Sequence, residues 1–402
     1  MIEVLKCKDG NNTIRINGVF QHSRYDVKKE AQNFYEQNVK NFKGNNLIMI
    51  GLGLGYHILE TLINIDRNIN IKVFEWSKEV YECSKQYGVL NEILRFSNVE
   101  IITDNILNRF AIELEKNDDV IIYKPSLKAL KDKKLKNLLM DFDVSRKSVL
   151  EGSSLLEENY LANKKTKYKY IDEFVSSFKS EIILVLTAGP SLDYEIQNIK
   201  KYSNCIKIIC VGSALRTLMK NNIKPNAVVI IDGQEIVKNQ IRDFENEQFP
   251  LLFLNTASRW AIDKFKGPKY MFFNEKKEES KFCITTGGTV GLAALSLAKE
   301  CGAKKIIMIG QDLAIINKKT HTTSFEETYN VINSVDKARY NKVVEGINGE
   351  ELPTDSTYLY FKRKIESFIS LNKDIKFINC GRGTKIQGTL DKEFIKVIKN
   401  IS

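Results

Sequence analysis

The feature that most constrains this chain is an apolar run at 182–186 that ends abruptly in Thr-Ala-Gly-Pro-Ser at 187–191. An unbroken, β-branched run is typical of a strand buried on both faces of a parallel sheet, and the amphipathic stretch after it predicts a helix. At the turn between them Gly189 lets the backbone approach a ligand, Pro190 sets the entry angle, and Ser191 can cap the helix. Free amides and the helix dipole there favour an anion, although an ordinary capped turn has the same sequence.

Strands and helices alternate in two series along the 402 residues, a length sufficient for two hydrophobic cores. The first series has strands at 47–50, 71–74, 99–103 and 119–123. The second has strands at 182–186, 207–211, 227–231, 251–255, 270–273 and 305–309, with a helix at 289–301 before the last. This alternation predicts an α/β protein with two Rossmann-like parallel-sheet domains in tandem and a helical C-terminal extension.

The predicted boundaries follow these series. Residues 1–45 form an N-terminal arm with a helix at 27–42, and residues 46–165 form the first Rossmann-like domain. Residues 166–325 form the central domain. Residues 326–402 form a mainly helical segment, with helices at 325–344 and 356–371 and a terminal strand at 375–379 that packs on the central domain.

Composition narrows the classes of function. The formal charge is +11, but the lysines are spread out and no basic motif interleaved with aromatics appears, so we expect no nucleic-acid partner. No apolar stretch is long enough to span a membrane and the N-terminus lacks a secretory segment, which predicts a cytoplasmic protein. The seven cysteines show no CxxC pair, so we expect free thiols and no metal site.

Two sets of residues at strand ends carry potential chemistry. In the first series, Gly51, Gly53 and Gly55 follow a strand and Glu75 ends the next, a layout that suits a nucleoside and that S-adenosylmethionine-dependent methyltransferases also show. Glycines that serve only tight packing are the alternative.

In the second series, Asp232 and Asp312 follow strands, and the sequence Thr-Thr-Gly-Gly-Thr at 285–289 opens a helix. His321 lies in a polar loop, where an imidazole can act as a general base or simply be solvated. Two amide-exposing turns beside strand-end carboxylates indicate nucleotide binding.

Several of these segments resemble one family, the bacterial motility accessory factor proteins, which are flagellin glycosyltransferases. The matching segments are GLGLGYH at 51–57, TAGPSL at 187–192, TGGTV at 286–290, GQDLA at 310–314 followed by Thr320 and His321, VEGING at 344–349 before Thr354 and Asp355, and CGRGTKIQG at 380–388. Their order along the chain is more specific than any single segment.

The resemblance implies transfer of a nonulosonic acid of pseudaminic, legionaminic or sialic type from its CMP-activated form to Ser or Thr of flagellin. The central domain is similar to bacterial sialyltransferases, which need no metal or other cofactor. By this resemblance His321 and Asp312 are catalytic, although their spacing is shorter here than in those transferases. The implied donor-binding residues are Ala188, Gly189, Pro190, Ser191, Asp232, Asn255, Thr286, Gly287, Gly288, Thr289 and Gln311. A homo-oligomer is compatible with the sequence.

Three alternatives stay open at this point. The archaeal hydroxymethylpterin pyrophosphokinases are similar to the same central domain, and would use ATP and Mg²⁺ with Asp232 and Asp312 as metal ligands. A non-catalytic flagellin-binding factor would carry the same sites in degenerate form. A methyltransferase would use the glycine-rich loop of the first series.

Overall fold

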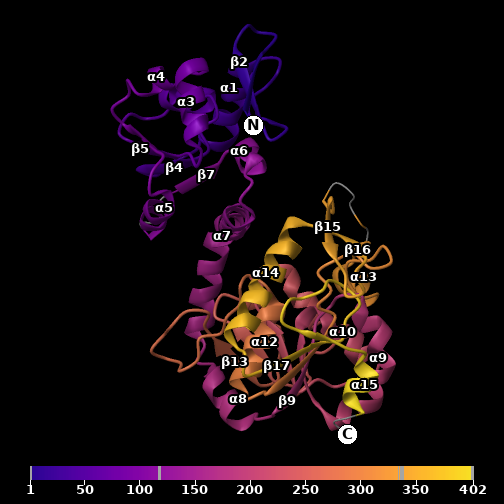
Figure 1. Cartoon of the computed structure of the whole chain (residues 1–402). Helices are drawn as coiled ribbons and strands as arrows, with labels where there is room; N and C mark the ends of the chain where they lie inside the picture. The colour runs from indigo at the N-terminus through magenta and orange to yellow at the C-terminus, as the bar shows by residue number, and fades with distance from the viewer. Residues whose placement is uncertain (1, 116–118, 334, 336–338, 400–402) are drawn as a thin grey trace. The chain divides into compact units, whose positions relative to one another are not determined.

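The structure is a computed structural model that describes residues 2–115, 119–333, 335 and 339–399. The chain divides into two compact units, an N-terminal unit at Met1–Asp143 and a C-terminal unit at Val144–Ser402. Figure 1 follows the chain through both units, and each is described by itself below.

The described part of the N-terminal unit contains a four-stranded parallel sheet in the order β6-β5-β4-β7. The chain order reverses between β4 and β7, and ligands of open α/β sheets bind at such switch points. The strands are β4 (Asn46–Ile50), β5 (Asn70–Phe74), β6 (Val99–Ile102) and β7 (Asp119–Ile122), and the helices between them are α2 (Tyr56–Asn64), α3 (Lys78–Tyr87), α4 (Leu90–Ile93) and α5 (Ile106–Glu115).

The predicted N-terminal arm is an antiparallel sheet followed by a helix. Its elements are β1 (Ile2–Lys6), β2 (Asn12–Ile16), β3 (Val19–Phe20) and α1 (Val27–Asn38). Helix α1 packs on α2 and ends four residues before the predicted end. The turn after β2 is tied to the short helix α6 (Lys124–Ala129), because Asn17 Nδ2 donates a hydrogen bond of 2.8 Å to the Ala129 carbonyl oxygen.

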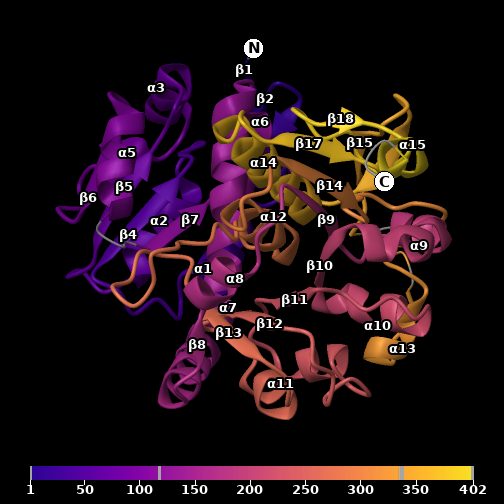
Figure 2. The ribbon, with the colours of Figure 1, turned by 90° about the horizontal axis from the view of Figure 1, so that it is seen from below.

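The C-terminal unit is built on a nine-stranded sheet, as far as the described residues show, in the order β18-β17-β14-β9-β10-β11-β12-β13-β8 (Figure 2). All of its pairings are parallel. The chain runs outward from β9 to β13 and then returns to β14 on the other side of β9, so the switch point lies between β9 and β14. The strands are β8 (Lys169–Tyr170), β9 (Ile182–Leu186), β10 (Lys207–Val211), β11 (Ala227–Ile230), β12 (Leu251–Leu254), β13 (Lys269–Phe272), β14 (Lys305–Ile309), β17 (Lys376–Asn379) and β18 (Leu390–Asp391).

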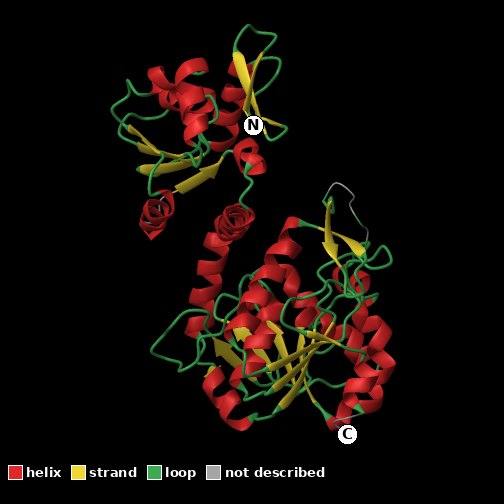
Figure 3. Ribbon diagram, in the orientation of Figure 1, coloured by secondary structure: helices red, strands yellow, loops and turns green. Residues whose placement is uncertain are grey.

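Helices flank this sheet, as Figure 3 shows in red around the yellow strands. They are α7 (Lys133–Lys165), which begins in the N-terminal unit, α8 (Ile171–Ser177), α9 (Ser191–Tyr202), α10 (Gly212–Lys220), α11 (Arg259–Lys264), α12 (Val290–Glu300), α13 (Ser324–Tyr329), α14 (Ser356–Leu371) and α15 (Phe394–Ile398), with 3₁₀ turns η1 (Ser203–Cys205) and η2 (Glu235–Gln240). Helix α12 packs against β9, β10 and β11 and is buried from Gly291 to Ala298, which explains its run of small and aliphatic residues.

The fold class predicted from the sequence is confirmed. Along the chain, the division between the two units falls between Asp143 and Val144, within α7. One local prediction differs from the structure. The helix predicted at 325–344 is wrong, because α13 ends at Tyr329 before a left-handed Asn330, and β15 (Lys342–Glu345) pairs with β16 (Glu351–Thr354) in an antiparallel hairpin. The predicted terminal strand corresponds to β17, which pairs in parallel with β14 in the nine-stranded sheet. No helix within the described ranges is long and apolar enough to cross a membrane.

Candidate functional site

A cavity of about 230 Å³ lies at the switch point of the C-terminal sheet. The ends of β9, β10, β11 and β14, the start of α12 and the segment around α13 surround it. Its lining residues are Thr187, Ala188, Gly189, Val211, Ser213, Asp232, Gln240, Thr289, Val290, Gly291, Gly310, Gln311, Asp312, Leu313, Thr320, His321, Phe325, Tyr329, Tyr358 and Phe361. Both amide-exposing turns of the second series therefore reach one cavity.

The first of these turns, at the start of α9, has no free amide in its first three positions. Ser191 N donates a hydrogen bond of 2.7 Å to Asp312 Oδ2, and the next two amides, of Leu192 and Asp193, donate to the carbonyl oxygens of Gly189 and Pro190. The Ser191 hydroxyl also contacts Asp312 Oδ1 and makes no capping bond of its own. The expectation that Ser191 caps the helix is therefore wrong, and the buried Asp312 carboxylate is the anion at this helix start.

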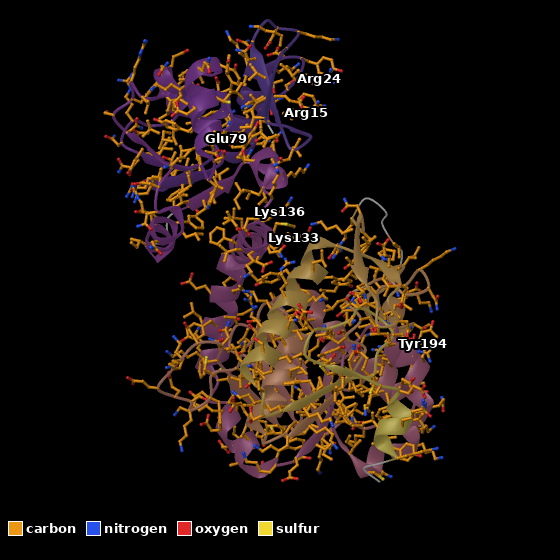
Figure 4. All side chains as sticks on the ribbon, in the orientation of Figure 1. Arg15, Arg24, Glu79, Lys133, Lys136 and Tyr194 are labelled. Carbon is orange, nitrogen blue, oxygen red and sulfur yellow. The ribbon has the colours of Figure 1, made fainter. Side chains whose placement is uncertain are left out.

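The C-terminal tail closes this turn from the other side. Arg382 N donates a hydrogen bond of 2.6 Å to Ser191 Oγ, and the Arg382 guanidinium lies 4.3 Å from the ring centre of Tyr194, which Figure 4 labels on α9. A Cβ at Gly383 would clash with the Asp312 backbone. Burial raises the pKa of the Asp312 carboxyl, and the Ser191 hydrogen bonds oppose that rise. Asp312 thus connects three segments that are far apart in the sequence.

The second turn, at the start of α12, is open. Gly287 and Gly288 both have left-handed backbones, with φ of 51° and 75°, a conformation that glycine adopts without strain. Thr289 precedes the helix without a side-chain cap. Val290 and Gly291 line the cavity, and their amides donate to no acceptor in the described part of the chain. An α-helix start with unpaired amides attracts anions.

Two polar groups lie opposite this open turn. The Asp232 side chain has accessible surface in the cavity and no hydrogen bond or ion pair with any described residue, while the surrounding protein raises the pKa of its carboxyl by desolvation. The Tyr329 hydroxyl accepts a hydrogen bond of 2.6 Å from Gln240 Nε2. Burial, with a smaller effect of the Asp232 charge, raises the pKa of Tyr329 to about 12, so its hydroxyl is protonated at neutral pH.

His321 is held in one tautomer by a short chain of hydrogen bonds. Asn333 Nδ2 donates to the His321 carbonyl oxygen at 2.9 Å, which fixes Asn333 Oδ1 as the acceptor for the Thr320 hydroxyl at 2.8 Å. Because the Thr320 hydroxyl donates to Asn333, it must accept from His321 Nδ1 at 2.9 Å. The proton therefore sits on Nδ1, and the lone pair of Nε2 is free. Burial, together with the Arg339 charge, lowers the pKa of His321 to about 4, so the ring is neutral at pH 7.

The loop that carries His321 is fastened to the ends of β9 and α9. Thr322 N donates a hydrogen bond of 2.9 Å to the Ala188 carbonyl oxygen, and both the amide and the hydroxyl of Thr323 donate to Asp193 Oδ2 at 2.8 Å. Phe325 stacks on the His321 ring with centroids 4.2 Å apart. Asp193 thus holds this loop in place.

The structure separates the residues expected at the site into two groups. Those that line the cavity are Ala188, Gly189, Asp232, Thr289, Gln311, Asp312 and His321. Those that lie behind or beside it are Pro190, Ser191, Asn255, Thr286, Gly287 and Gly288. Asn255 is buried after β12, and its Oδ1 has no hydrogen-bond partner among the described residues. Their roles towards a donor stay predictions.

Sequence reasoning missed four polar residues at or behind the cavity: Gln240, Tyr329, Asn333 and Tyr358. Burial raises the pKa of Tyr358 well above its usual range, so this hydroxyl is also a proton donor at neutral pH. None of the four belongs to a strand-end or glycine motif, and each comes to the site through the packing of segments after β11 or β14. No local pattern in the sequence could have identified them.

The glycine-rich loop of the N-terminal unit is closed by its own neighbours. Glu75 accepts hydrogen bonds from the amides of Leu52 at 2.8 Å and Ser77 at 2.9 Å, and Leu54 N donates to His22 Nε2 at 2.8 Å. A Cβ at Gly53 would lie 2.6 Å from the same imidazole nitrogen. The close approaches that require glycine are therefore made to protein atoms, which supports the packing alternative.

Comparison with known proteins finds a family match for the central part of the chain. Residues 158–318 match the family described as "6-hydroxymethylpterin diphosphokinase MptE-like". The matched segment holds β9 to β14 and most of the cavity lining, and it leaves the N-terminal sheet and the C-terminal tail outside the match.

One similar solved structure is that of a MAf glycosyltransferase from Magnetospirillum magneticum AMB-1. The identity is 15% and the TM-score 0.49, over 97% of this chain and 70% of that chain. The sequence segments predict a likeness to motility accessory factors, and a MAf glycosyltransferase is among the proteins to which this chain is similar. No curated protein matches the sequence.

Proposed function

We propose that the C-terminal unit is a glycosyltransferase that moves a nonulosonic acid of pseudaminic, legionaminic or sialic type from its CMP-activated donor to a Ser or Thr hydroxyl of flagellin. One observation supports a transferase above all: a single cavity is lined by Val290 and Gly291, whose amides have no acceptor among the described residues, and by His321, whose neutral ring keeps Nε2 without a hydrogen bond to a described residue. The identities of nucleotide, sugar and acceptor rest on the sequence resemblance.

The two groups suit the two demands of such a transfer. The bond between the anomeric carbon and the phosphate oxygen breaks, and the phosphate leaves with the bonding electrons. Amides of Val290 and Gly291, with the protonated hydroxyl of Tyr329 or Tyr358, would stabilise that negative charge. The acceptor oxygen forms the new bond to the anomeric carbon while His321 Nε2 takes its proton, a contribution of about 10²–10⁴-fold for a well-placed base.

In this proposal Asp312 positions α9 and does not transfer a proton, because Ser191 engages both of its carboxylate oxygens. The scheme requires no metal or other cofactor. The cavity of about 230 Å³ is smaller than the roughly 300–1,000 Å³ typical of ligand sites, so part of the nucleotide would extend beyond it, on the side of Asp232 and the end of β12.

The match to the pterin diphosphokinase family favours a second candidate, an enzyme that uses ATP and Mg²⁺. Mg²⁺ at such a site is held by one or two carboxylates and the phosphates. Asp232 has free oxygens for that purpose, whereas Asp312 would first have to leave Ser191. No cluster of three or more metal-ligating side chains occurs within the ranges that the structure describes.

A ligand panel separates these candidates. CMP at about a hundred times its dissociation constant is expected to stabilise the fold by about 2.7 kcal/mol, which raises Tm by about 5–10 °C. The measurement is thermal unfolding with CMP, with ATP and Mg²⁺, and with S-adenosylmethionine. An equal or larger shift with ATP and Mg²⁺ would favour the pterin kinase instead, and a shift with S-adenosylmethionine alone would favour the methyltransferase.

A transfer assay then tests the reaction itself. Purified chain, CMP-activated nonulosonic acid and unmodified flagellin are mixed, and the mass of flagellin is measured. The expected product is heavier by one sugar residue, and the variant His321→Gln slows its formation by about 10²-fold or more. Unchanged transfer by this variant would favour a base other than His321. No transfer at all, together with binding of flagellin, would favour the non-catalytic alternative.

A further inference from the structure

The N-terminal unit contains a second cavity, of about 560 Å³, that the proposed transfer does not use. Its volume falls within the roughly 300–1,000 Å³ typical of small-molecule sites. Tyr123 directly follows β7, and His57 lies in the first turn of α2, after β4 and its glycine loop. The cavity is therefore at the carboxyl ends of β4 and β7, at the switch point of the first sheet, where ligands of such folds bind.

The floor of this cavity is made of aromatic rings. His57 and Tyr123 are stacked with centroids 3.9 Å apart and an angle of 11° between their planes, and Phe34 meets His57 edge-on at 5.0 Å. His57 and Tyr123 are buried, while Phe34 is half-buried. The accessible part of the Phe34 ring, which the buried His57–Tyr123 stack supports, offers an apolar surface on which C–H groups of a ligand can pack.

Hydrogen bonds hold the floor in one arrangement. Because the Leu54 amide donates to His22 Nε2, the imidazole proton of His22 is on Nδ1, which donates to the Tyr123 hydroxyl at 3.0 Å. That hydroxyl lies 3.0 Å from Glu30 Oε1, and Ser23 N donates to the other carboxylate oxygen at 2.6 Å. Burial lowers the pKa of both His22 and His57, so both rings are neutral at pH 7. The floor is thus preorganised and uncharged.

One wall is a polar face of α1. Glu30, Asn33, Phe34 and Gln37 follow one another at intervals that place them on the same side of the helix, and all four line the cavity. The amide side chains of Asn33 and Gln37 make no hydrogen bond to any described residue. Each amide offers both donors and an acceptor, and the Glu30 carboxylate offers further acceptors.

The charges around the cavity cancel. Asp26 and Glu30 are matched by Lys29 and Lys124, so the lining favours no ligand of strong charge. Side-chain amides and a carboxylate on one wall match the donors and acceptors of neighbouring hydroxyl groups, and the aromatic floor matches a face of C–H groups. Sugars present both surfaces. We infer that the N-terminal unit binds a neutral saccharide in this cavity, a function beyond the proposed transfer.

The test uses the full chain and a panel of neutral sugars: galactose, mannose, N-acetylglucosamine and N-acetylgalactosamine. N-acetylneuraminic acid and inorganic phosphate form the charged arm. Binding is measured by saturation-transfer NMR for the sugars and by thermal unfolding for all ligands. At least one neutral sugar is expected to bind, and the double variant Asn33→Ala/Gln37→Ala is expected to weaken it about tenfold, through the loss of two hydrogen bonds.

A matched control is available on the same helix. Gln32 lies on α1 outside the cavity lining, and its amide contacts Glu36 at 3.4 Å, so Gln32→Ala removes the same kind of side chain without touching the site. This variant is expected to bind as the unchanged protein does, and so is His321→Gln, which alters only the C-terminal unit. No binding of any neutral sugar, an equal loss in Gln32→Ala, or tighter binding of a charged ligand that Asn33→Ala/Gln37→Ala weakens would each overturn the inference. None of these results depends on whether the chain transfers a sugar.

Discussion

The tautomer of His321 gives the sharpest test of the proposed chemistry, through the variant Thr320→Val. This change keeps the shape of the side chain and removes the hydroxyl that accepts from His321 Nδ1 at 2.9 Å. A buried donor left without an acceptor costs about 1–3 kcal/mol, so the Nδ1–H tautomer loses about that much of its advantage. The ratio of the Nδ1–H to the Nε2–H tautomer is expected to fall by about 5- to 150-fold, and kcat is expected to fall with the fraction of molecules that keep a free Nε2. KM for the donor is expected to stay the same, because the amides of α12 are unchanged.

The tautomer can also be measured without any activity. The chain has only three histidines, so protein labelled with ¹⁵N in histidine gives three imidazole spin systems, and His321→Gln identifies the one from His321. In the unchanged protein that ring is expected to carry its proton on Nδ1, and in Thr320→Val to lose this preference. Thr320→Ser keeps the hydroxyl and serves as the control, with tautomer and kcat close to the original. The reasoning would be refuted if Thr320→Val kept full kcat, or if the original ring carried its proton on Nε2.

Three further predictions follow from the same contacts. The pKa of His321 is lowered from 6.5 to about 4, so its neutral form stabilises the fold above pH 6.5 and that contribution is lost as pH falls towards 4. In urea titrations, the difference in unfolding free energy between the original protein and His321→Gln should therefore shrink between pH 7 and 5. Asp312→Ala should lower the free energy of unfolding by about 2–4 kcal/mol, because it leaves the Ser191 amide at the start of α9 unpaired. Added formate should recover part of this loss, whereas an equal concentration of chloride should not. Asp193→Ala should reduce kcat by about tenfold with little change in Tm, because the partly exposed hydrogen bonds from Thr323 to Asp193 hold the loop of His321. An unchanged kcat would mean that the loop does not need this contact.

The sequence predicted the strands well and the long-range contacts poorly, for a physical reason. Strands β9, β10 and β14 begin and end at the predicted residues, because a buried parallel strand is an unbroken apolar run with polar or glycine residues at its ends. Most of β15 was predicted as the end of a helix and β16 was not predicted, because both strands are short, mostly half-exposed or exposed, and carry mixed polar and apolar residues. The turn between the two strands contains Gly349 with φ of 85°. The sequence alone does not show that this glycine has a left-handed backbone.

The two glycine-containing turns show where motif reasoning stops. Both start a helix after glycine, and both were expected to bind an anion. At α9 the anion belongs to the protein, because Asp312, 121 residues further along the chain, reaches the Ser191 amide. At α12 no carboxylate of the described chain takes that place, and Gln311 packs its neutral amide against Gly291 instead. Local sequence determines that a helix start can bind an anion, whereas the packing of distant segments determines whether that position is already filled. The start of α12, which lines the same cavity as His321, is consequently the position where the leaving phosphate of the proposed transfer would gain most from the fold.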